Sequence, residues 1–277
     1  MHGHTHAHGQ PAVGGTVLSF EELAEQLGAD RQDALGDDDR AMVDEQLAIV
    51  EHQWRQAVTR GLVRGFLLSG PPGVGKTTAA KRLAYELGRR FPRRAGRGGV
   101  ATVLLDGSEV ARAKYGESEQ RIRGIFAAAA EGFGLAAQRT VLIFDDIESI
   151  FLARGSDQAK EWHYSQDSVF FHAVDGLDTG RVVLVLTTNR RDLIDEAIRD
   201  RFLEYPVGYP PAAALLELAN RSLADQGLDP AARAAFAAEL EPAVADGSVR
   251  SLRDAQRAAA RFYVAHLAGR RAPAVAT

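Results

Sequence analysis

The middle of the chain, residues 63–208, alternates short apolar runs with longer amphipathic segments. An apolar run of four to eight residues is typical of a buried strand, and the periodicity of the segments between such runs is typical of helices. Alternation of this kind predicts a mostly parallel sheet with helices on both faces. We predict five strands, at residues 65–69, 100–106, 141–145, 182–187 and 204–207.

Helical patterns precede and follow this region. Ser19, with Glu22 three positions later, predicts a capped helix over residues 19–27. The acidic residues 37–39 suit the positive end of a helix and predict a longer one over about residues 40–60. The C-terminal part is rich in alanine, leucine and arginine and predicts a small helical domain, with helices over residues 212–226, 230–239 and 248–267.

We therefore expect an α/β protein with four segments along its chain. These are a largely disordered tail with a short helix (1–36), a linker helix (37–62), the α/β domain (63–208) and the helical domain (209–277). Four histidines alternate with small residues in the tail: His2, His4, His6 and His8. A His-rich tract can bind transition metals. A solvated tail is the favoured interpretation, because no second cluster of ligands accompanies the tract.

The composition excludes several classes of function. The 277 residues are 45% hydrophobic and 25% charged, as in ordinary globular proteins. A net charge of −4 gives no general attraction to nucleic acids or anionic membranes. No apolar run approaches the roughly 18–20 residues of a membrane span, and the N-terminus lacks a signal sequence, so we expect a cytoplasmic protein. The absence of cysteine excludes disulfides and thiolate metal sites.

Between the first predicted strand and a helical segment lies the pattern G-x-x-x-x-G-K-[ST] of a phosphate loop. Its glycines allow backbone N–H groups to wrap around phosphates at a helix N-terminus. Lys76 would reach the β- and γ-phosphates, and the Thr77 hydroxyl would bind a Mg²⁺ ion. A chance Gly/Pro turn would not explain the matching strand and helix. The predicted nucleotide contacts are Gly70, Pro71, Pro72, Gly73, Val74, Gly75, Lys76, Thr77 and Thr78.

Polar residues follow two further predicted strands. Asp145 and Asp146 end the apolar run at 141–144, so both carboxylates should lie at the edge where doubly wound sheets bind ligands. Asp145 suits a Mg²⁺ ion and Asp146 suits the group that polarises the attacking water. Asn189 follows the strand at 182–187 and could bond that water or the γ-phosphate. It could equally close the strand with a turn.

Six short motifs occur in a fixed order along the chain. They lie at residues 70–78 (GPPGVGKTT), 114–119 (KYGESE), 144–148 (FDDIE), 175–177 (DGL), 188–190 (TNR) and 195–202 (DEAIRDRF). In this order they resemble the AAA clade of the AAA+ ATPases, over about residues 63–267. The resemblance implies a five-stranded sheet, a helical lid over bound ATP and Mg²⁺, and assembly into a homo-oligomeric ring, commonly a hexamer. Members of the clade use ATP turnover to pull, unfold or disassemble protein substrates.

The resemblance also implies roles for single residues. Lys76 and Thr77 correspond to Walker A, Asp145 and Asp146 to Walker B, and Asn189 to sensor 1. Arg201 resembles an arginine finger that reaches a neighbouring subunit's γ-phosphate, a task that suits a permanently charged guanidinium. For Arg201 the alternative is a surface ion pair with Glu196 or Asp200.

Further roles implied by the resemblance concern the lid and the channel of the ring. Arg250 lies where some members keep a sensor-2 arginine. The first pore loop, which grips polypeptide, corresponds to Lys114, Tyr115 and Gly116. For Tyr115 the alternative is packing at a helix start. A second pore loop falls near Trp162, His163 and Tyr164.

Three features depart from the family pattern. Asp146 is one methylene shorter than the usual glutamate, the pore-loop motif is one residue short, and Asp200 interrupts the usual arginine pair. We expect a ring-forming, chaperone-like ATPase that remodels a protein substrate, with hydrolysis slowed by Asp146. The alternative is a slowly hydrolysing, ATP-dependent oligomeric scaffold or switch. A nucleic-acid-associated loader has only the arginine-rich stretch at 89–97 in its favour, so nucleic acid is not an expected partner.

Overall fold

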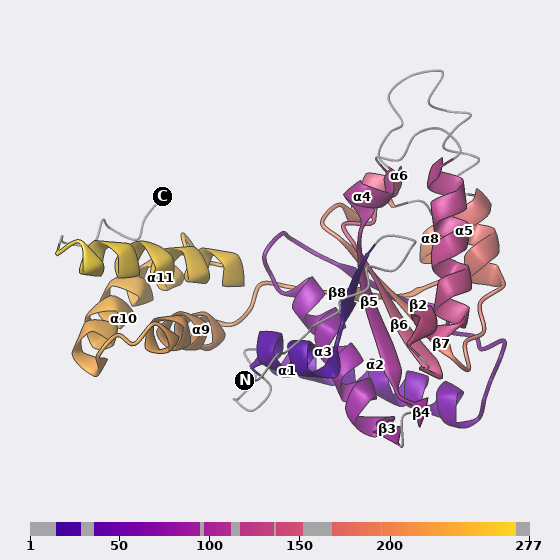
Figure 1. The fold of residues 1–277 in the computed structure, drawn as a ribbon. Helices are drawn as coiled ribbons and strands as arrows, with labels where there is room; N and C mark the ends of the chain where they lie inside the picture. Colours follow the sequence, from indigo (N-terminus) through magenta and orange to yellow (C-terminus); the bar gives the residue numbers. More distant parts are fainter. Residues whose placement is uncertain are drawn as a thin grey trace.

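The computed structural model describes residues 15–28, 36–94, 97–111, 117–135, 137–151, 168–194 and 196–269. Its main sheet has six strands in the order β1-β5-β6-β7-β2-β8 (Figure 1). The strands are β1 (Thr16–Leu18), β2 (Gly65–Ser69), β5 (Val100–Asp106), β6 (Arg139–Asp145), β7 (Val182–Thr188) and β8 (Leu203–Pro206). The last five are mutually parallel and confirm the predicted sheet. The antiparallel edge strand β1 was not predicted, because three residues are too few to show a period.

Helices cover both faces of the sheet. Along β6, Val141 and Ile143 face one apolar core, whereas Leu142 and Phe144 face the other. The first core packs against α2 (Asp37–Arg55) and α3 (Lys76–Arg90), and the second against α5 (Glu117–Ala130) and the helical residues 168–175. Strands buried on both faces lose polar alternation, which explains the continuous apolar runs in the sequence.

The N-terminal helices agree with the sequence in kind and differ in extent. Helix α1 (Phe20–Leu27) begins at the predicted capping box, in which Ser19 and Glu22 bond each other's backbone N–H groups. Helix α2 starts at Asp37 and ends at Arg55, so the prediction of 40–60 was wrong at both ends. The chain leaves the helix because Ala57 has a φ of 50°, a left-handed conformation that does not continue an α-helix.

Three C-terminal helices form a separate layer beside the sheet, on the left in Figure 1. They are α9 (Ala212–Asp225), α10 (Pro230–Ala245) and α11 (Leu252–Leu267). Their own core contains Leu215, Leu223, Phe236 and Phe262. Helix α10 runs past the predicted end at 239, because Leu240 and Ala243 are also buried in this core.

The remaining elements are short. They are β3 (Arg93–Arg94), β4 (Arg97–Gly98), α4 (Gly107–Ala111), η1 (Gly132–Gly134), α6 (Glu148–Phe151), η2 (Arg191–Leu193) and α8 (Glu196–Arg199). Strands β3 and β4 pair as a small antiparallel hairpin between α3 and β5. Among the residues that the structure describes, no helix has the length and apolar character needed to cross a membrane.

Candidate nucleotide-binding site

The predicted phosphate loop lies between β2 and α3, at the carboxyl edge of the sheet. Gly73 and Gly75 have φ angles of 79° and 110°, a region that side chains with a Cβ atom rarely adopt. A Cβ on Gly73 would also lie 2.8 Å from the Cβ of Arg253. Because Gly75 caps α3, the first N–H groups of the helix are directed toward the loop. The backbone therefore has the form of an anion site.

Lys76 is the centre of the hydrogen-bond network around this loop. Its side chain is buried, with 5% of the residue surface exposed. The ammonium group donates to the carbonyl oxygens of Gly70 (2.9 Å) and Pro71 (2.8 Å) and to Oδ1 of Asn189 (2.7 Å). Burial lowers the pKa of Lys76, although the carboxylate of Asp146 acts in the opposite direction. Lys76 is thus fixed at the edge of the sheet by groups from its own loop and by Asn189, which follows β7.

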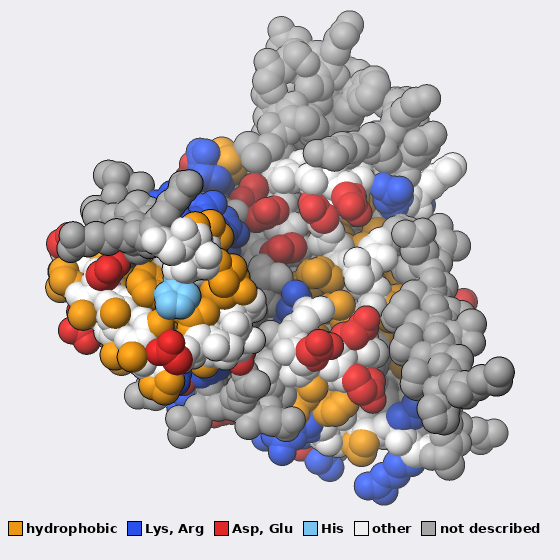
Figure 2. Space-filling model, turned by 60° about the vertical axis from the view of Figure 1, so that its left-hand side comes forward, with side chains coloured by type: hydrophobic (Ala, Val, Ile, Leu, Met, Phe, Trp, Pro, Cys, Tyr) orange, Lys and Arg blue, Asp and Glu red, His pale blue; other side chains and the backbone are white. Residues whose placement is uncertain are grey.

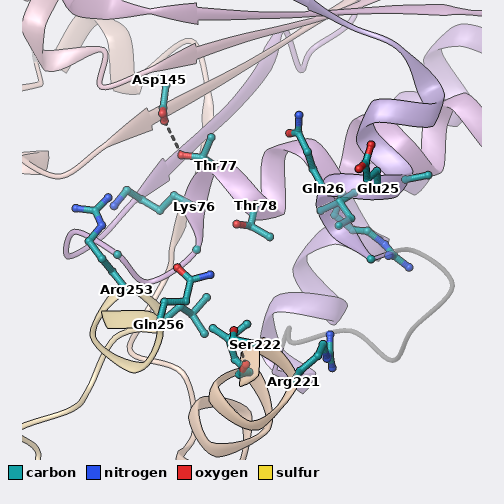
Figure 3. Close-up of a pocket in the computed structure, with 18 of the residues that line it drawn as sticks. Glu25, Gln26, Lys76, Thr77, Thr78, Asp145, Arg221, Ser222, Arg253 and Gln256 are labelled. Atoms are coloured by element: carbon teal, nitrogen blue, oxygen red, sulfur yellow. Dashed lines mark hydrogen bonds between the residues drawn. The ribbon is translucent and has the colours of Figure 1, made fainter. Parts of the chain in front are cut away.

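Thr77 and Asp145 form the second part of the network, drawn as the dashed line in Figure 3. The Thr77 hydroxyl donates to Oδ1 of Asp145 at 2.7 Å, and the Thr187 hydroxyl donates to the same oxygen at 2.5 Å. A hydroxyl and a carboxylate side by side fit Mg²⁺, which binds oxygen ligands and fills its other positions with water and substrate phosphates. The described residues contain no cluster of three metal-ligating side chains. A Mg²⁺ ion here would complete its coordination with water or phosphate oxygens.

Asp146 lies at the turn after β6 with a φ of 53°. One carboxylate oxygen accepts a hydrogen bond of 2.6 Å from Nδ2 of Asn189. The pKa of Asp146 is raised above its usual value, first by burial and then by the nearby charges of Asp145 and Glu148. The structure thus brings Asp146 and Asn189, predicted from two separate strands, into direct contact.

Glu148 is a residue of this network to which the sequence assigned no separate role. It is 6% exposed, and its Oε1 accepts a hydrogen bond of 3.0 Å from the backbone N–H of Asn189. Asn189 is therefore held at three points, by Lys76, Asp146 and Glu148. A carboxylate two positions after Asp146 was visible in the sequence, but its burial behind Asn189 depends on the fold.

A cavity of about 1190 Å³ opens above these residues. In Figure 2 it lies in the hollow between the C-terminal helices and the body of the molecule, with acidic side chains gathered nearby. It is at least as large as typical small-molecule sites, which measure about 300–1,000 Å³. Its walls come from the loop and α3, from both ends of α1, from helix α9 and the start of α11, and from the residues at the ends of β6 and β7.

The structure separates Arg253, in the first turn of α11, from Arg250, which precedes the helix. Arg250 lies outside the residues that line the cavity and stacks over the ring of Tyr209 at 5.0 Å. Arg253 lines the cavity, and Figure 3 shows its side chain directed toward Lys76. This proximity also contributes to the lowered pKa of Lys76. Two cations that converge on one space favour an anion between them, so Arg253 suits the role predicted for Arg250.

Arg201 lies outside the cavity lining. Its guanidinium donates to both carboxylate oxygens of Asp175, at 3.0 and 2.9 Å, and to the carbonyl oxygen of Ala197 at 2.8 Å. The ring of Phe171 lies 4.7 Å from it. The side-chain partner is thus Asp175, rather than Glu196 or Asp200 as the sequence had suggested. The predicted pore-loop residues Lys114, Tyr115, Gly116, Trp162, His163 and Tyr164 and the histidine tract lie outside the described residues.

A buried parallel strand, a phosphate loop, and a lysine, threonine, aspartate and asparagine at one sheet edge define a P-loop nucleotide-binding domain. The family model of the ATPase family associated with various cellular activities (AAA) matches residues 66–206. The chain belongs to this family, which confirms the resemblance seen in its motifs.

Curated relatives support this assignment. An "AAA ATPase forming ring-shaped complexes" from Corynebacterium glutamicum (strain R) is 33% identical over 192 residues, which cover 68% of this chain and 36% of the relative. The "Vesicle-fusing ATPase" of Arabidopsis thaliana is 35% identical over 141 residues, which cover 49% and 18%. The "Proteasome-associated ATPase" of Thermomonospora curvata is 34% identical over 137 residues, which cover 49% and 23%. The matched part is therefore about a third or less of the length of each of these relatives.

Solved structures support the fold. A crystal structure of the FIGL-1 AAA domain in complex with ADP superimposes with a TM-score of 0.60 at 18% sequence identity. The alignment covers 87% of this chain and 78% of that domain. The α/β sheet with its helical C-terminal part is therefore the AAA fold.

Proposed function

We propose that this chain is the ATP-binding and ATP-hydrolysing module of a Mg²⁺-dependent ATPase that works as a homo-oligomeric ring, with a hexamer as the expected form. The observation that carries the proposal is the network of Lys76, Thr77, Asp145 and Asn189 beside a phosphate loop. In this proposal residues 63–208 form the nucleotide domain, residues 209–277 the lid and residues 37–62 the link from the N-terminal tail. We expect the protein to work in the cytoplasm.

Each residue of the network has a task that follows from its contacts. Lys76 and Arg253 would hold phosphate oxygens from two sides, and the N–H groups of the loop would complete their binding. Thr77 and Asp145 would hold Mg²⁺, which neutralises charge on the phosphate oxygens when bound. Asp146 and Asn189, joined by their 2.6 Å hydrogen bond, would orient the attacking water.

The ring is supported by the relatives and by Arg201. Several relatives are named as ring-forming ATPases. Arg201 lies outside the cavity of its own chain, so it could act on phosphate only in another copy. Relatives named for vesicle fusion and for the proteasome favour a protein substrate, and we propose remodelling of a protein or protein complex as the work of the ring.

The test combines ATP turnover with mass by light scattering across a range of protein concentrations. Turnover should rise with assembly and be lost in both Lys76→Ala and Arg201→Ala. Mixing the two inactive variants is the sharper experiment. The Lys76→Ala chain supplies an intact arginine to the intact site of its Arg201→Ala neighbour, so the mixture should recover part of the activity. An inactive mixture that still assembles would argue against a shared site.

A slowly hydrolysing scaffold or switch is the second candidate, and Asp146 is the observation in its favour. Its carboxylate is one methylene shorter than the family's glutamate and is bonded to Asn189. A displacement of about 1 Å can cost on the order of 10²-fold in rate. A gain of that size in Asp146→Glu, with ATP affinity unchanged, would favour the switch. Equal turnover of parent and variant would favour the active ATPase.

A further inference from the structure

The outer edge of the main sheet is only partly covered by β1. The register of this pair runs from Thr16 opposite Leu104 to Leu18 opposite Thr102. The chain then turns away at Ser19 to begin α1. Within the described part of the chain, β6 is the only strand paired with Val100 and Ala101. A sheet edge of this kind presents backbone groups that can pair with one more strand.

A groove with a volume of about 760 Å³ runs beside this free edge. One side is formed by Phe20, Gly88 and Phe91, and the other includes Leu135 and Ala137. Phe20 and Leu135, one on each side, are 42% and 41% exposed and so leave apolar surface for an occupant. Successive side chains of a strand point to opposite faces. A strand laid on this edge would therefore direct its odd-numbered side chains to one wall and its even-numbered side chains to the other.

The ends of the groove differ in charge. Arg93 of β3 marks the end at the β3–β4 hairpin, the neighbouring Arg94 is exposed as well, and Arg89 also lines the groove. The side chain of Arg89 is 58% exposed although it pairs with Glu86. The opposite end carries Glu21 and Glu22 of α1. A strand that continues in the direction of β1 reaches the hairpin with its carboxyl end, and that end should be acidic.

We propose that this groove is a docking site for a short extended segment of a partner protein. The segment pairs with Val100 and Ala101 as an antiparallel strand, in line with β1. It carries apolar or β-branched side chains on both of its faces and acidic residues at its carboxyl end. Strand addition at a sheet edge gains affinity from main-chain hydrogen bonds and specificity from alternate side chains. The apolar walls and the net charge of −4 disfavour a nucleic acid as the occupant.

The test uses a dye-labelled peptide, Val-Thr-Val-Thr-Val-Asp-Asp, and fluorescence anisotropy with the full chain. One control peptide has proline at the central position, which removes a backbone donor. The other ends in Lys-Lys. We expect each control to bind about tenfold more weakly than the parent peptide, because one lost hydrogen bond or charge contact changes affinity by that order. Equal binding of the proline peptide would overturn the proposal.

Protein variants locate the peptide. Leu135→Ser should weaken binding about tenfold, because an apolar contact is lost. Leu203→Ser is the matched control, since Leu203 is 40% exposed on β8, at the other edge of the same sheet. Arg93→Glu/Arg94→Glu should weaken binding of the Asp-Asp peptide and strengthen binding of the Lys-Lys peptide. The double variant Arg257→Glu/Arg261→Glu, at exposed positions of α11, should change the binding of neither peptide.

Two further measurements complete the test. All variants should bind a fluorescent ATP analogue as the parent does, which shows that they are folded. Failure of the parent itself to bind nucleotide would contradict the proposed function, whereas the docking proposal would still be decided by the peptide measurements. Equal losses in Leu135→Ser and Leu203→Ser would overturn the docking site. Displacement of the peptide by a short oligothymidine, lost in Arg93→Glu/Arg94→Glu, would also overturn it in favour of a nucleic-acid surface.

Discussion

The nucleotide cavity has two walls of different construction. The phosphate end consists of side chains from the loop and from the ends of neighbouring strands: Lys76, Thr77, Asp145 and Asn189. The lid wall consists of side chains from α9 and α11: Arg221, Ser222, Arg253 and Gln256.

The two walls also differ in how firmly they are held. Hydrogen bonds of 2.7 Å connect the phosphate end internally, and its members rest on one continuous sheet. The lid wall rests on its own apolar core, and the N–H of Arg253 reaches the carbonyl oxygen of Gly73 at 3.4 Å. The phosphate end is therefore preorganised, and we expect the lid wall to change position as a unit when the nucleotide changes.

The largest expected effect tests whether the lid has an independent core. Phe236→Ala removes a fully buried ring that contacts Phe262 at a centroid distance of 4.9 Å. Such a change costs about 3–5 kcal/mol. Hydrogen exchange should then rise across residues 212–267 while the strands of the sheet keep their protection. Equal loss of protection in both parts would show that the walls are one cooperative unit.

The next effect concerns the phosphate end. Lys76→Ala should weaken ATP binding up to about 100-fold, because a hydrogen bond to a charged group is worth about 1.5–3 kcal/mol. Titration with a fluorescent ATP analogue measures it. Lys81→Ala on the same helix removes the same charge and one contact to Gln26 but no contact to the loop, so it should weaken binding far less than Lys76→Ala. A similar loss in both variants would mean that general charge, rather than the network, holds the phosphate.

A smaller effect separates the two arginines of the lid. Arg253→Ala should weaken ATP binding about tenfold, since its guanidinium faces the phosphate end. Arg250→Ala should change affinity no more than about twofold, because Arg250 stacks on Tyr209 outside the cavity. Isothermal titration calorimetry of both variants measures the ATP affinity and shows which arginine contributes to it. The reverse order of effects would restore Arg250 as the sensor.

The smallest effect is a pH dependence at the phosphate end. The folded state raises the pKa of Asp146, so it binds this proton more tightly than the unfolded chain does. Stability therefore falls as the pH rises from the unfolded pKa toward the folded one. Asp146→Asn should be more stable than the parent at neutral pH, by less than about 1 kcal/mol because the group is partly solvated. Denaturant unfolding between pH 3 and 8 should show this difference vanish at the acid end.

The control for this prediction is a surface carboxylate. Asp44→Asn changes an exposed position of α2, so its stability should follow that of the parent at every pH. A gain at neutral pH in both variants would reflect the net charge of −4 rather than the site. A constant difference for Asp146→Asn across the whole range would instead point to a change in packing.

Features that depend on local pattern could be predicted from the sequence. Five strands were found because strands buried on both faces read as apolar runs, and the phosphate loop because its residues are contiguous. Placement at one edge then brought Asp145, Asp146 and Asn189 together, as parallel topology requires. The roles of these residues remain predictions that the experiments above address.

The features that differ from the sequence-based predictions depend on tertiary structure, except for the start of the last helix. Strand β1 exists because β5 offers it an edge, and Glu148 matters because the fold buries it against Asn189. The last helix was predicted to start at Ser248, which placed Arg250 inside it. The capping box of Ser251 and Asp254 was present in the sequence, and it starts the helix at Leu252. That start leaves Arg250 outside the helix.

Helix α1 separates the nucleotide cavity from the groove at the sheet edge, and Phe20 and Glu21 line both. The helix is attached to α3 by the stacking of Phe20 on Tyr85 at 4.9 Å and by a 3.0 Å hydrogen bond from Lys81 to Gln26. A shared wall couples two binding equilibria whenever one occupant moves it. Thermodynamic reciprocity then requires that a segment which tightens nucleotide binding by some factor is itself bound more tightly, by that same factor, when nucleotide is present.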